Sequence, residues 1–118
     1  MAILGLGIDV VALDRFDQTL DRTPGFLEKV FTPAERELGR RSLAARWAAK
    51  EALAKALGAP AGLAWHDAEI VRGADGAPQL AIRGTVAARA AALGIVTLHL
   101  SMSHDAGVAS AVVVAEGA

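Results

Sequence analysis

The chain has 118 residues, a net charge of −1, no cysteine, and a composition that is 53% hydrophobic but only 4% aromatic. This length predicts one domain, residues 1–118, with a small core of aliphatic side chains. The near-zero charge argues against nucleic-acid or membrane-surface binding, and the lack of cysteine excludes disulfides, thiolate zinc sites and cysteine nucleophiles. We expect a cytoplasmic protein, and a small core of Ala and Val favours an oligomer.

Residues 2 to 12 are almost continuously apolar and predict a β-strand buried on both faces. The segment lacks the basic leader of a signal peptide, and Asp9 interrupts it too soon for a membrane span. By the period of two, Gly5, Gly7 and Asp9 share one face. Either the glycines leave room for a ligand beside the carboxylate, or they admit a close-packed helix while Asp9 caps the following one.

Two short helices are expected before the middle of the chain. Residues 12 to 20 predict the first. Thr32, Pro33 and Glu35 predict the start of the second, with Thr32 as N-cap, Pro33 in the first helical position and Glu35 in the capping-box position. This structural role is sufficient to explain Glu35.

Residues 42 to 57 are rich in strong helix formers and predict the central helix, with Ser42 as N-cap and Gly58 as the C-terminal stop. The helix has a predicted apolar stripe and four charged residues beside it. The stripe consists of Leu43, Trp47, Ala54 and Leu57, bordered by Arg46 and Lys50 on one side and by Glu51 and Lys55 on the other. Helix physics favours a surface pair between Glu51 and Lys55, whereas a functional interpretation makes Glu51 a metal ligand and the three cations a phosphate-binding set.

The second half of the chain predicts mainly β-structure. The expected elements are a strand at 65–72, a turn at 73–78, a return strand at 79–82, a helix at 85–93, and strands at 95–102 and 107–115 joined around 103–106. Three consecutive valines place the last strand at the centre of a sheet or at a subunit interface. His66 and His99 have the setting of structural histidines, whereas His104 lies on the last predicted turn, where functional groups concentrate.

Three motifs, taken together, resemble the holo-acyl-carrier-protein synthases, the short homotrimeric class of 4'-phosphopantetheinyl transferases. They are Gly5-Leu6-Gly7-Ile8-Asp9-Val10-Val11, Phe31-Thr32-Pro33-Ala34-Glu35 and Arg46-Trp47-Ala48-Ala49-Lys50-Glu51-Ala52-Leu53-Ala54-Lys55-Ala56-Leu57-Gly58. Asp75-Gly76-Ala77-Pro78 and Ser101-Met102-Ser103-His104 extend the resemblance through nearly the whole chain. The first motif alone is weak, but combined with the Trp-x-x-Lys-Glu-x-x-x-Lys run it is specific.

The resemblance implies an α+β fold, present as a single copy, in which a small antiparallel sheet packs with a long central helix and shorter helices. It implies transfer of 4'-phosphopantetheine from coenzyme A to a serine hydroxyl of apo acyl carrier protein, releasing adenosine 3',5'-bisphosphate and supporting fatty acid biosynthesis. Such a reaction requires positioning, charge neutralisation and removal of a proton. A homotrimer with active sites in the clefts between subunits is also implied.

The resemblance further assigns roles to individual residues. Asp9 and Glu51 match the family's magnesium ligands, and Lys55 would reach the pyrophosphate. The remaining assignments are Arg46, Lys50 and His104 to the nucleotide and its 3'-phosphate, Gly76 and Pro78 to the turn beside the adenosine, and Arg15 to the helix that meets the acidic carrier protein.

One position departs from the longer relatives that modify carrier domains of peptide synthetases. Those proteins are two fused copies of this unit and carry a third acidic ligand where this chain has Val11. Two other functions use the same residues: a metal-dependent phosphohydrolase acting through Asp9 and Glu51, and a trimeric coenzyme A-binding module without catalysis. The general base is left open between a metal-bound water and Glu51 acting through water.

Overall fold

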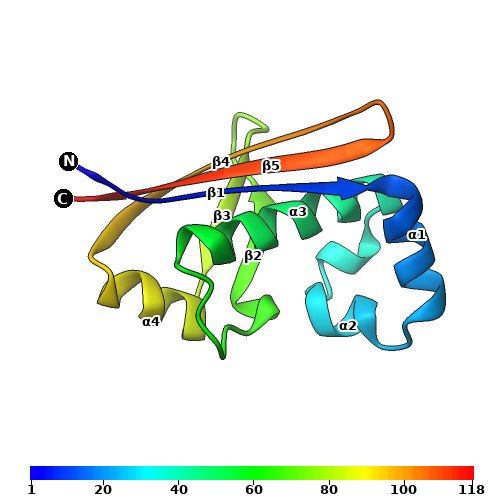
Figure 1. Ribbon diagram of the computed structural model, residues 1–118, viewed down its shortest axis with the longest axis horizontal. Helices are drawn as coiled ribbons and strands as arrows, with labels where there is room; N and C mark the ends of the chain where they lie inside the picture. Colours follow the sequence, from blue (N-terminus) through cyan, green and yellow to red (C-terminus); the bar gives the residue numbers. More distant parts are fainter.

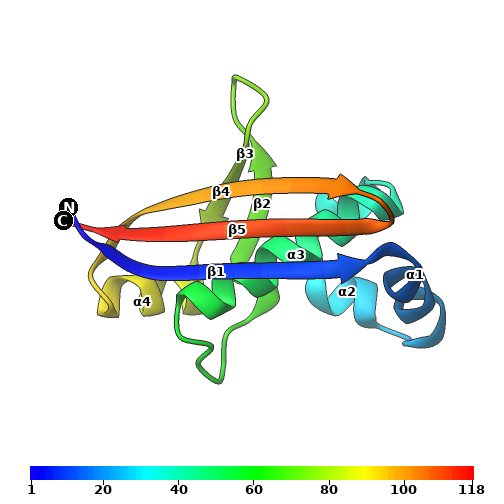
Figure 2. The same cartoon turned by 45° about the horizontal axis from the view of Figure 1, so that its top comes forward.

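The structure is a computed structural model that describes all 118 residues. A three-stranded antiparallel sheet covers one side of a long central helix, and a β-hairpin and the shorter helices lie around the rest of that helix (Figures 1 and 2). The predicted α+β architecture is therefore confirmed. None of the helices combines the length and the apolar character needed to cross a bilayer.

The sheet consists of β1 (Ile3–Ala12), β5 (Val108–Gly117) and β4 (Ile95–Asp105), in that spatial order. The central place of β5 confirms the prediction made from its valines, and Val113 is fully buried. Asp9 lies opposite Ala111 of β5, which in turn lies opposite Met102 of β4. The two chain ends lie together at one end of the sheet (Figure 2).

The central helix α3 (Arg40–Ala56) packs against the inner face of β1, where the glycines lie. A Cβ atom on Gly7 would lie 1.8 Å from the carbonyl oxygen of Ala52, and one on Gly5 would lie 2.0 Å from that of Ala56. The glycines therefore admit a close-packed helix. Asp9 does not cap the following helix, whose N-cap is Ala12.

The start of α3 differs from the prediction. The helix begins at Arg40 with Gly39 as N-cap, so Ser42 is a helical residue and its assignment as the N-cap is wrong. Gly58 has φ +86°, a left-handed conformation that ends the helix as predicted. The helix is also buried over more than one stripe, because alanines on several sides lie against the sheet and the hairpin.

The outer face of β1 is uncovered, so the prediction that the strand is buried on both faces is wrong for a single chain. Its four outward side chains are Leu4, Leu6, Ile8 and Val10, which are 47%, 64%, 63% and 59% exposed. The strand lies at the edge of the sheet, because β5 is its only partner. A contiguous apolar surface therefore faces outward from this chain.

The remaining elements surround α3. They are α1 (Leu13–Arg22), α2 (Phe26–Val30), the 3₁₀ turns η1 (Glu35–Glu37) and η2 (Trp65–Asp67), the hairpin of β2 (Ala68–Arg72) and β3 (Pro78–Ile82), and α4 (Gly84–Ala92). The hairpin is confirmed, but the first three residues of the predicted strand 65–72 form η2 instead. The capping box between Thr32 and Glu35 forms, yet it starts only the single turn η1.

Two further differences from the prediction concern an additional helix and the length of a strand. Helix α2 was not predicted, and it adds Phe26 to an edge-to-face aromatic cluster with Phe16, Phe31 and Trp47. Strand β4 continues to Asp105, so His104 lies on the strand rather than on the predicted turn.

Candidate functional site

Two clefts lie on either side of the N-terminal two-thirds of α3, and they share no lining residue. The first, which we call the acidic cleft, has a volume of about 230 Å³ and is lined by Asp9, Glu51, Arg15, Thr19 and Trp47 among others. The second, the basic cleft, has a volume of about 340 Å³ and is lined by Arg46, Arg72, His104, Ser42, Ser103, Pro78, Ala45 and Met102.

The acidic cleft brings together a carboxylate from β1 and one from α3. Asp9 follows Gly7 on the inner face of the strand, and Glu51 precedes Ala52, the residue whose backbone touches Gly7. The close approach of helix and strand at Gly7 is therefore what places the two carboxylates next to each other.

Lys55, one turn after Glu51, also reaches this site. Its ammonium group donates to the Asp9 carboxylate at 3.1 Å and to the carbonyl of Ile8 at 2.9 Å. Helix spacing alone predicts a pair with Glu51, but the structure pairs Lys55 with Asp9 instead. The side chain of Asp9 is only 13% exposed while that of Lys55 is 52% exposed, so part of the lysine side chain is left open to solvent.

The electrostatics of the acidic cleft favour a positively charged ligand. Burial raises the pKa of the Glu51 carboxyl above its ordinary value of 4.5, the neighbouring Asp9 raises it further, and Lys55 acts in the opposite direction. One lysine does not relieve the repulsion between two adjacent carboxylates. An all-oxygen donor set of this kind suits a hard divalent cation.

Asp9 and Glu51 are the two acids that line the acidic cleft, and no group of three or more histidine, aspartate or glutamate side chains in the chain is placed to hold a metal ion. Val11, the position of the third acid in longer relatives, lines the cleft as an apolar side chain. A divalent cation held here would therefore need water or substrate oxygens to complete its coordination.

Helix α1 forms the outer wall of the acidic cleft through Arg15 and Thr19. Arg15 makes no ion pair within the chain, whereas Arg40 is held at 2.6 Å by Asp21 and at 3.6 Å by Asp17. Arg15 is therefore a free positive charge at the mouth of this cleft.

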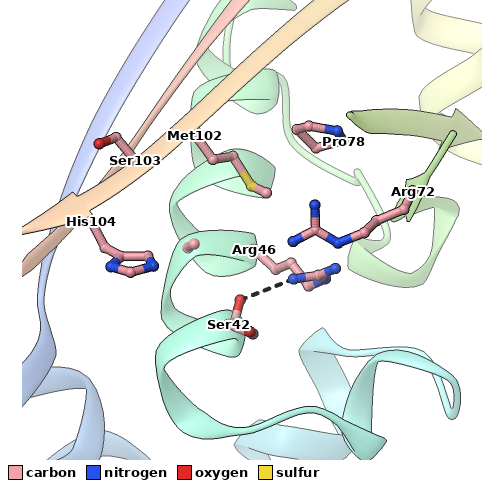
Figure 3. Close-up of a pocket in the computed structure, with 8 residues that line it drawn as sticks. Ser42, Arg46, Arg72, Pro78, Met102, Ser103 and His104 are labelled. Carbon is pink, nitrogen blue, oxygen red and sulfur yellow. Dashed lines mark hydrogen bonds between the residues drawn. The ribbon is translucent and has the colours of Figure 1, made fainter. Parts of the chain in front are cut away.

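The basic cleft contains two guanidinium groups, an imidazole and two hydroxyls, and no carboxylate lines it (Figure 3). Arg46 forms its floor. This side chain is only 5% exposed, its Nε has no hydrogen-bond partner, and its Nη1 reaches only the carbonyl of Ser42, at 3.4 Å. An arginine buried in this way retains donors that an anion in the cleft would satisfy.

The β2–β3 hairpin forms one wall of the basic cleft. Pro78 lines it, and Arg72, opposite Pro78 in the strand register, projects into it. Gly76 does not line the cleft; its φ of +83° shapes the turn, and its carbonyl accepts a 2.8 Å hydrogen bond from Arg72. Sequence reasoning missed Arg72, although its position four residues before Gly76 could have indicated it.

Lys50 lies in neither of these two clefts, which contradicts its expected contact with the nucleotide. Its ammonium group is fully buried and donates to Glu35 at 2.8 Å, to the carbonyl of Trp65 at 3.1 Å and to that of Ala68 at 2.7 Å. These three partners use all three of its donors. Glu35 thus has a second role beyond the capping box, which sequence reasoning did not assign to it.

The sheet separates the two clefts within one chain. Asp9 is on β1 and His104 is on β4, with β5 between these strands. Two strand spacings amount to about 10 Å, before the offset along the strands is added. The acidic and basic groups are therefore brought close to α3 but not into one continuous cleft.

Comparison with known proteins identifies relatives along the whole chain. Residues 5–112 match the family model of the 4'-phosphopantetheinyl transferase superfamily. The chain is 62% identical over 117 residues to a holo-acyl-carrier-protein synthase of Frankia alni, with 98% of this chain and 99% of that protein covered. It is 57% identical over 115 residues to a protein of the same name from Clavibacter sepedonicus, with 98% and 97% covered.

Solved structures of similar proteins have the same fold. A coenzyme A complex of the synthase from Chronobacterium ammoniagenes has a TM-score of 0.87 and 32% identity, covering 100% of this chain and 99% of that one. The Helicobacter pylori holo-acyl-carrier-protein synthase, also in complex with coenzyme A, has a TM-score of 0.82 and 33% identity, covering 94% and 99%.

Proposed function

Since this chain belongs to the 4'-phosphopantetheinyl transferase superfamily, as a holo-acyl-carrier-protein synthase, we propose that its acidic and basic clefts are the two halves of that enzyme's active site. The enzyme transfers 4'-phosphopantetheine from coenzyme A to a serine hydroxyl of apo acyl carrier protein. The products are holo acyl carrier protein and adenosine 3',5'-bisphosphate. The observation that carries the proposal is the meeting of Asp9 and Glu51 in one cleft, with Lys55 bonded to Asp9.

The chemistry sets three requirements for the protein. The serine oxygen forms a bond to the phosphorus that carries pantetheine, the bond from that phosphorus to the pyrophosphate bridging oxygen breaks, and the serine proton must be removed. Phosphoryl transfer of this kind depends mainly on positioning and on neutralising the charge of the phosphate oxygens. The protein therefore needs cations at the pyrophosphate and an acceptor for one proton.

We assign the acidic cleft to the pyrophosphate, with Asp9 and Glu51 as ligands of a magnesium ion. The support is the raised pKa of Glu51 and the all-oxygen donor set, which fit a hard cation that takes its other ligands from water and phosphate. Magnesium supplies charge neutralisation at the phosphate oxygens. Lys55, held beside Asp9, adds a positive charge for the leaving group. Either a metal-bound water or Glu51 acting through water would accept the serine proton.

We assign the basic cleft to the nucleotide portion of coenzyme A. Arg46 and His104 offer donors to phosphate, Pro78 offers an apolar edge to the adenosine, and Gly76 shapes the turn that carries Pro78. Lys50 is left out of this set because its donors are already occupied. Arg15, free at the mouth of the acidic cleft, is the proposed contact with the acidic carrier protein.

We further propose that the active enzyme is a homotrimer of single-domain chains, with each site formed between two copies. The support is the uncovered apolar face of β1 and the separation of the clefts by β5. A neighbouring copy that covers this face could place its basic cleft opposite the acidic cleft. We assign the enzyme to fatty acid biosynthesis in the cytoplasm, a setting with which the lack of cysteine agrees.

The test is the intact mass of apo acyl carrier protein after incubation with this protein, coenzyme A and magnesium. A gain of one phosphopantetheine is expected, and a chelator should prevent it. Glu51→Gln should also prevent it while circular dichroism shows an unchanged fold, and activity retained by this variant would contradict the metal assignment. Release of phosphate from coenzyme A without any carrier protein would identify a phosphohydrolase instead.

A further inference from the structure

The basic cleft holds more positive charge than the chain itself neutralises. Arg46 is buried with an unpartnered Nε, and burial lowers the pKa of its guanidinium, as does the nearby charge of Arg72. Glu35 is the one acid that raises that pKa, but its carboxylate is already engaged by Lys50 at 2.8 Å. Two arginines therefore face the same space without a carboxylate between them.

Arg72 is held in position for a ligand in that space. It is the last residue of β2, and its Nη1 donates to the carbonyl of Gly76 across the turn at 2.8 Å, which leaves the rest of its guanidinium free. In the close-up the side chains of Arg46 and Arg72 extend toward each other from the helix and from the hairpin (Figure 3). A buried arginine at the floor and an exposed one at the rim can hold one anion between them.

A phosphate monoester fits this arrangement better than a diester. A terminal phosphate carries close to two negative charges at neutral pH and three free oxygens, so it can accept paired hydrogen bonds from two guanidinium groups at once. The hydroxyls of Ser42 and Ser103 and the imidazole of His104 line the same cleft and add shorter donors. A phosphate inside a pyrophosphate has fewer free oxygens and less charge.

We propose that Arg72 is a specificity-determining residue that, together with Arg46, grips the 3'-phosphate of coenzyme A and makes the enzyme select coenzyme A over its 3'-dephospho form. The inference rests on the proposed function, because it places the nucleotide in the basic cleft. It adds a residue that the sequence motifs do not assign and that replaces Lys50 in the phosphate-binding set.

Steady-state transfer to acyl carrier protein from coenzyme A and from 3'-dephospho-coenzyme A tests the proposal. Arg72→Gln should lower kcat/KM for coenzyme A about 10- to 100-fold, the usual effect of losing charge-assisted hydrogen bonds, and leave the dephospho donor within about 2-fold. Arg72→Lys, which keeps the charge but loses the planar fork, should fall in between. Arg41→Gln is the matched control, since it removes one exposed arginine from α3 outside this cleft and should change neither value.

Equal losses with both donors, or no loss with either, would overturn the proposal, as would a wild-type enzyme that does not discriminate between them. Calorimetric binding of adenosine 3',5'-bisphosphate and of adenosine 5'-monophosphate separates this proposal from the proposed function, because it needs no transfer. The wild-type protein should bind the bisphosphate more tightly, and Arg72→Gln should remove the difference. A preference retained by the variant would refute the role of Arg72 even in a protein that transferred nothing.

Discussion

Two lysines five residues apart on α3 have different roles because of where their ammonium groups end. Lys50 is enclosed by η1 and by the start of β2, where Glu35 and two carbonyls accept all its donors. Burial lowers the pKa of Lys50, and its contact with Glu35 counteracts this effect. Lys55 ends at a half-open position beside Asp9. The first lysine joins elements of the fold, and the second is available to a substrate.

The first prediction follows from this difference. Lys50→Met leaves the Glu35 carboxylate buried without a cation and removes one hydrogen bond from each of the carbonyls of Trp65 and Ala68, so it should reduce the free energy of unfolding by about 3–5 kcal/mol. The double variant Glu35→Gln/Lys50→Met should recover part of that loss, since it removes the uncompensated charge. Urea denaturation measures both.

Lys55→Met is the matched control for that experiment. Its ammonium group is 52% exposed, so its removal should change the free energy of unfolding by about 1 kcal/mol or less while transfer activity falls. Equal stability losses for the two lysine variants would contradict the assignment of Lys50 to the fold.

The second prediction concerns pH and the acidic cleft. The pKa of Glu51 is raised in the folded state by burial and by Asp9, so the folded protein binds that proton more tightly than the unfolded chain does. Its contribution to stability is therefore present at low pH and is lost as pH rises through the interval between the ordinary value of 4.5 and the raised one. With a chelator present to remove divalent cations, the Tm of the wild-type protein should fall as pH rises through this interval.

Glu51→Gln isolates the effect, because an amide does not titrate. The Tm difference between the variant and the wild-type protein should grow in favour of the variant as pH rises through that interval. Adding magnesium at neutral pH should raise the Tm of the wild-type protein and not that of the variant. If the Tm values of the two proteins changed with pH in parallel, the raised pKa of Glu51 would be contradicted.

At this scale the sequence predicted some of the side-chain contacts and missed others. The meeting of Asp9 and Glu51 was predictable from motif resemblance, whereas helix geometry alone favoured a pair between Glu51 and Lys55. The buried state of Lys50 was not predictable, because the periodicity of α3 places it beside the apolar stripe and says nothing about the carbonyls of Trp65 and Ala68 that accept its donors. Arg72 was missed because Arg46 and His104, which line the basic cleft with it, lie in other elements.

At the scale of elements, the contact between β1 and α3 determines the geometry of the acidic cleft. Glycines on the strand and alanines on the helix allow the two backbones to approach each other closely. This contact places the two carboxylates. Asp9 lies two residues after Gly7 on β1, and Glu51 lies one residue before Ala52 on α3. A change in the separation of helix and strand should therefore alter stability and activity together.

The third prediction tests this coupling. Gly7→Ala adds a methyl group whose carbon would lie 1.8 Å from the carbonyl oxygen of Ala52, which is backbone that cannot rotate away. The helix must move, so the free energy of unfolding should fall by about 1–3 kcal/mol or more and transfer should drop by at least about 10-fold. Gly39→Ala is the control: nothing lies within 4 Å of its added carbon, and its φ of −70° suits alanine. Full activity in Gly7→Ala would contradict the coupling.

The element boundaries show what local patterns could and could not predict. The apolar strand, the alanine-rich helix with Gly58 at its end, and the hairpin around Gly76 were predictable, because each has its own periodicity or turn chemistry. Ser42 was a wrong N-cap because Gly39 starts the helix three residues earlier without a side-chain cap. His104 belongs to the strand because β5 continues to pair with β4 as far as Asp105, a partnership that no local pattern reveals.

At the scale of the whole molecule, the uncovered face of β1 is the main feature that a single chain leaves without a partner. Four aliphatic side chains on an edge strand are a surface that monomeric proteins rarely expose, because water contact with them costs free energy and the strand edge invites association. The acidic cleft opens beside this strand and the basic cleft beside β4. In a closed ring of identical chains, the β1 side of each chain would contact the β4 side of the next. This one kind of contact would cover β1 and join an acidic cleft to a basic cleft at every interface.

The fourth prediction follows from sites shared between copies. One chain carries Glu51→Gln, which disables its acidic cleft, and another carries Arg72→Gln with His104→Ala, which weakens its basic cleft. Each variant alone should have little activity. After the two are mixed under conditions that exchange subunits, about one quarter of the interfaces should pair an intact acidic cleft with an intact basic cleft, so about one quarter of wild-type activity should return. Sedimentation of wild-type protein should show three chains. If each chain instead held a complete site, no mixture would regain activity, because every chain in it would carry a disabled cleft.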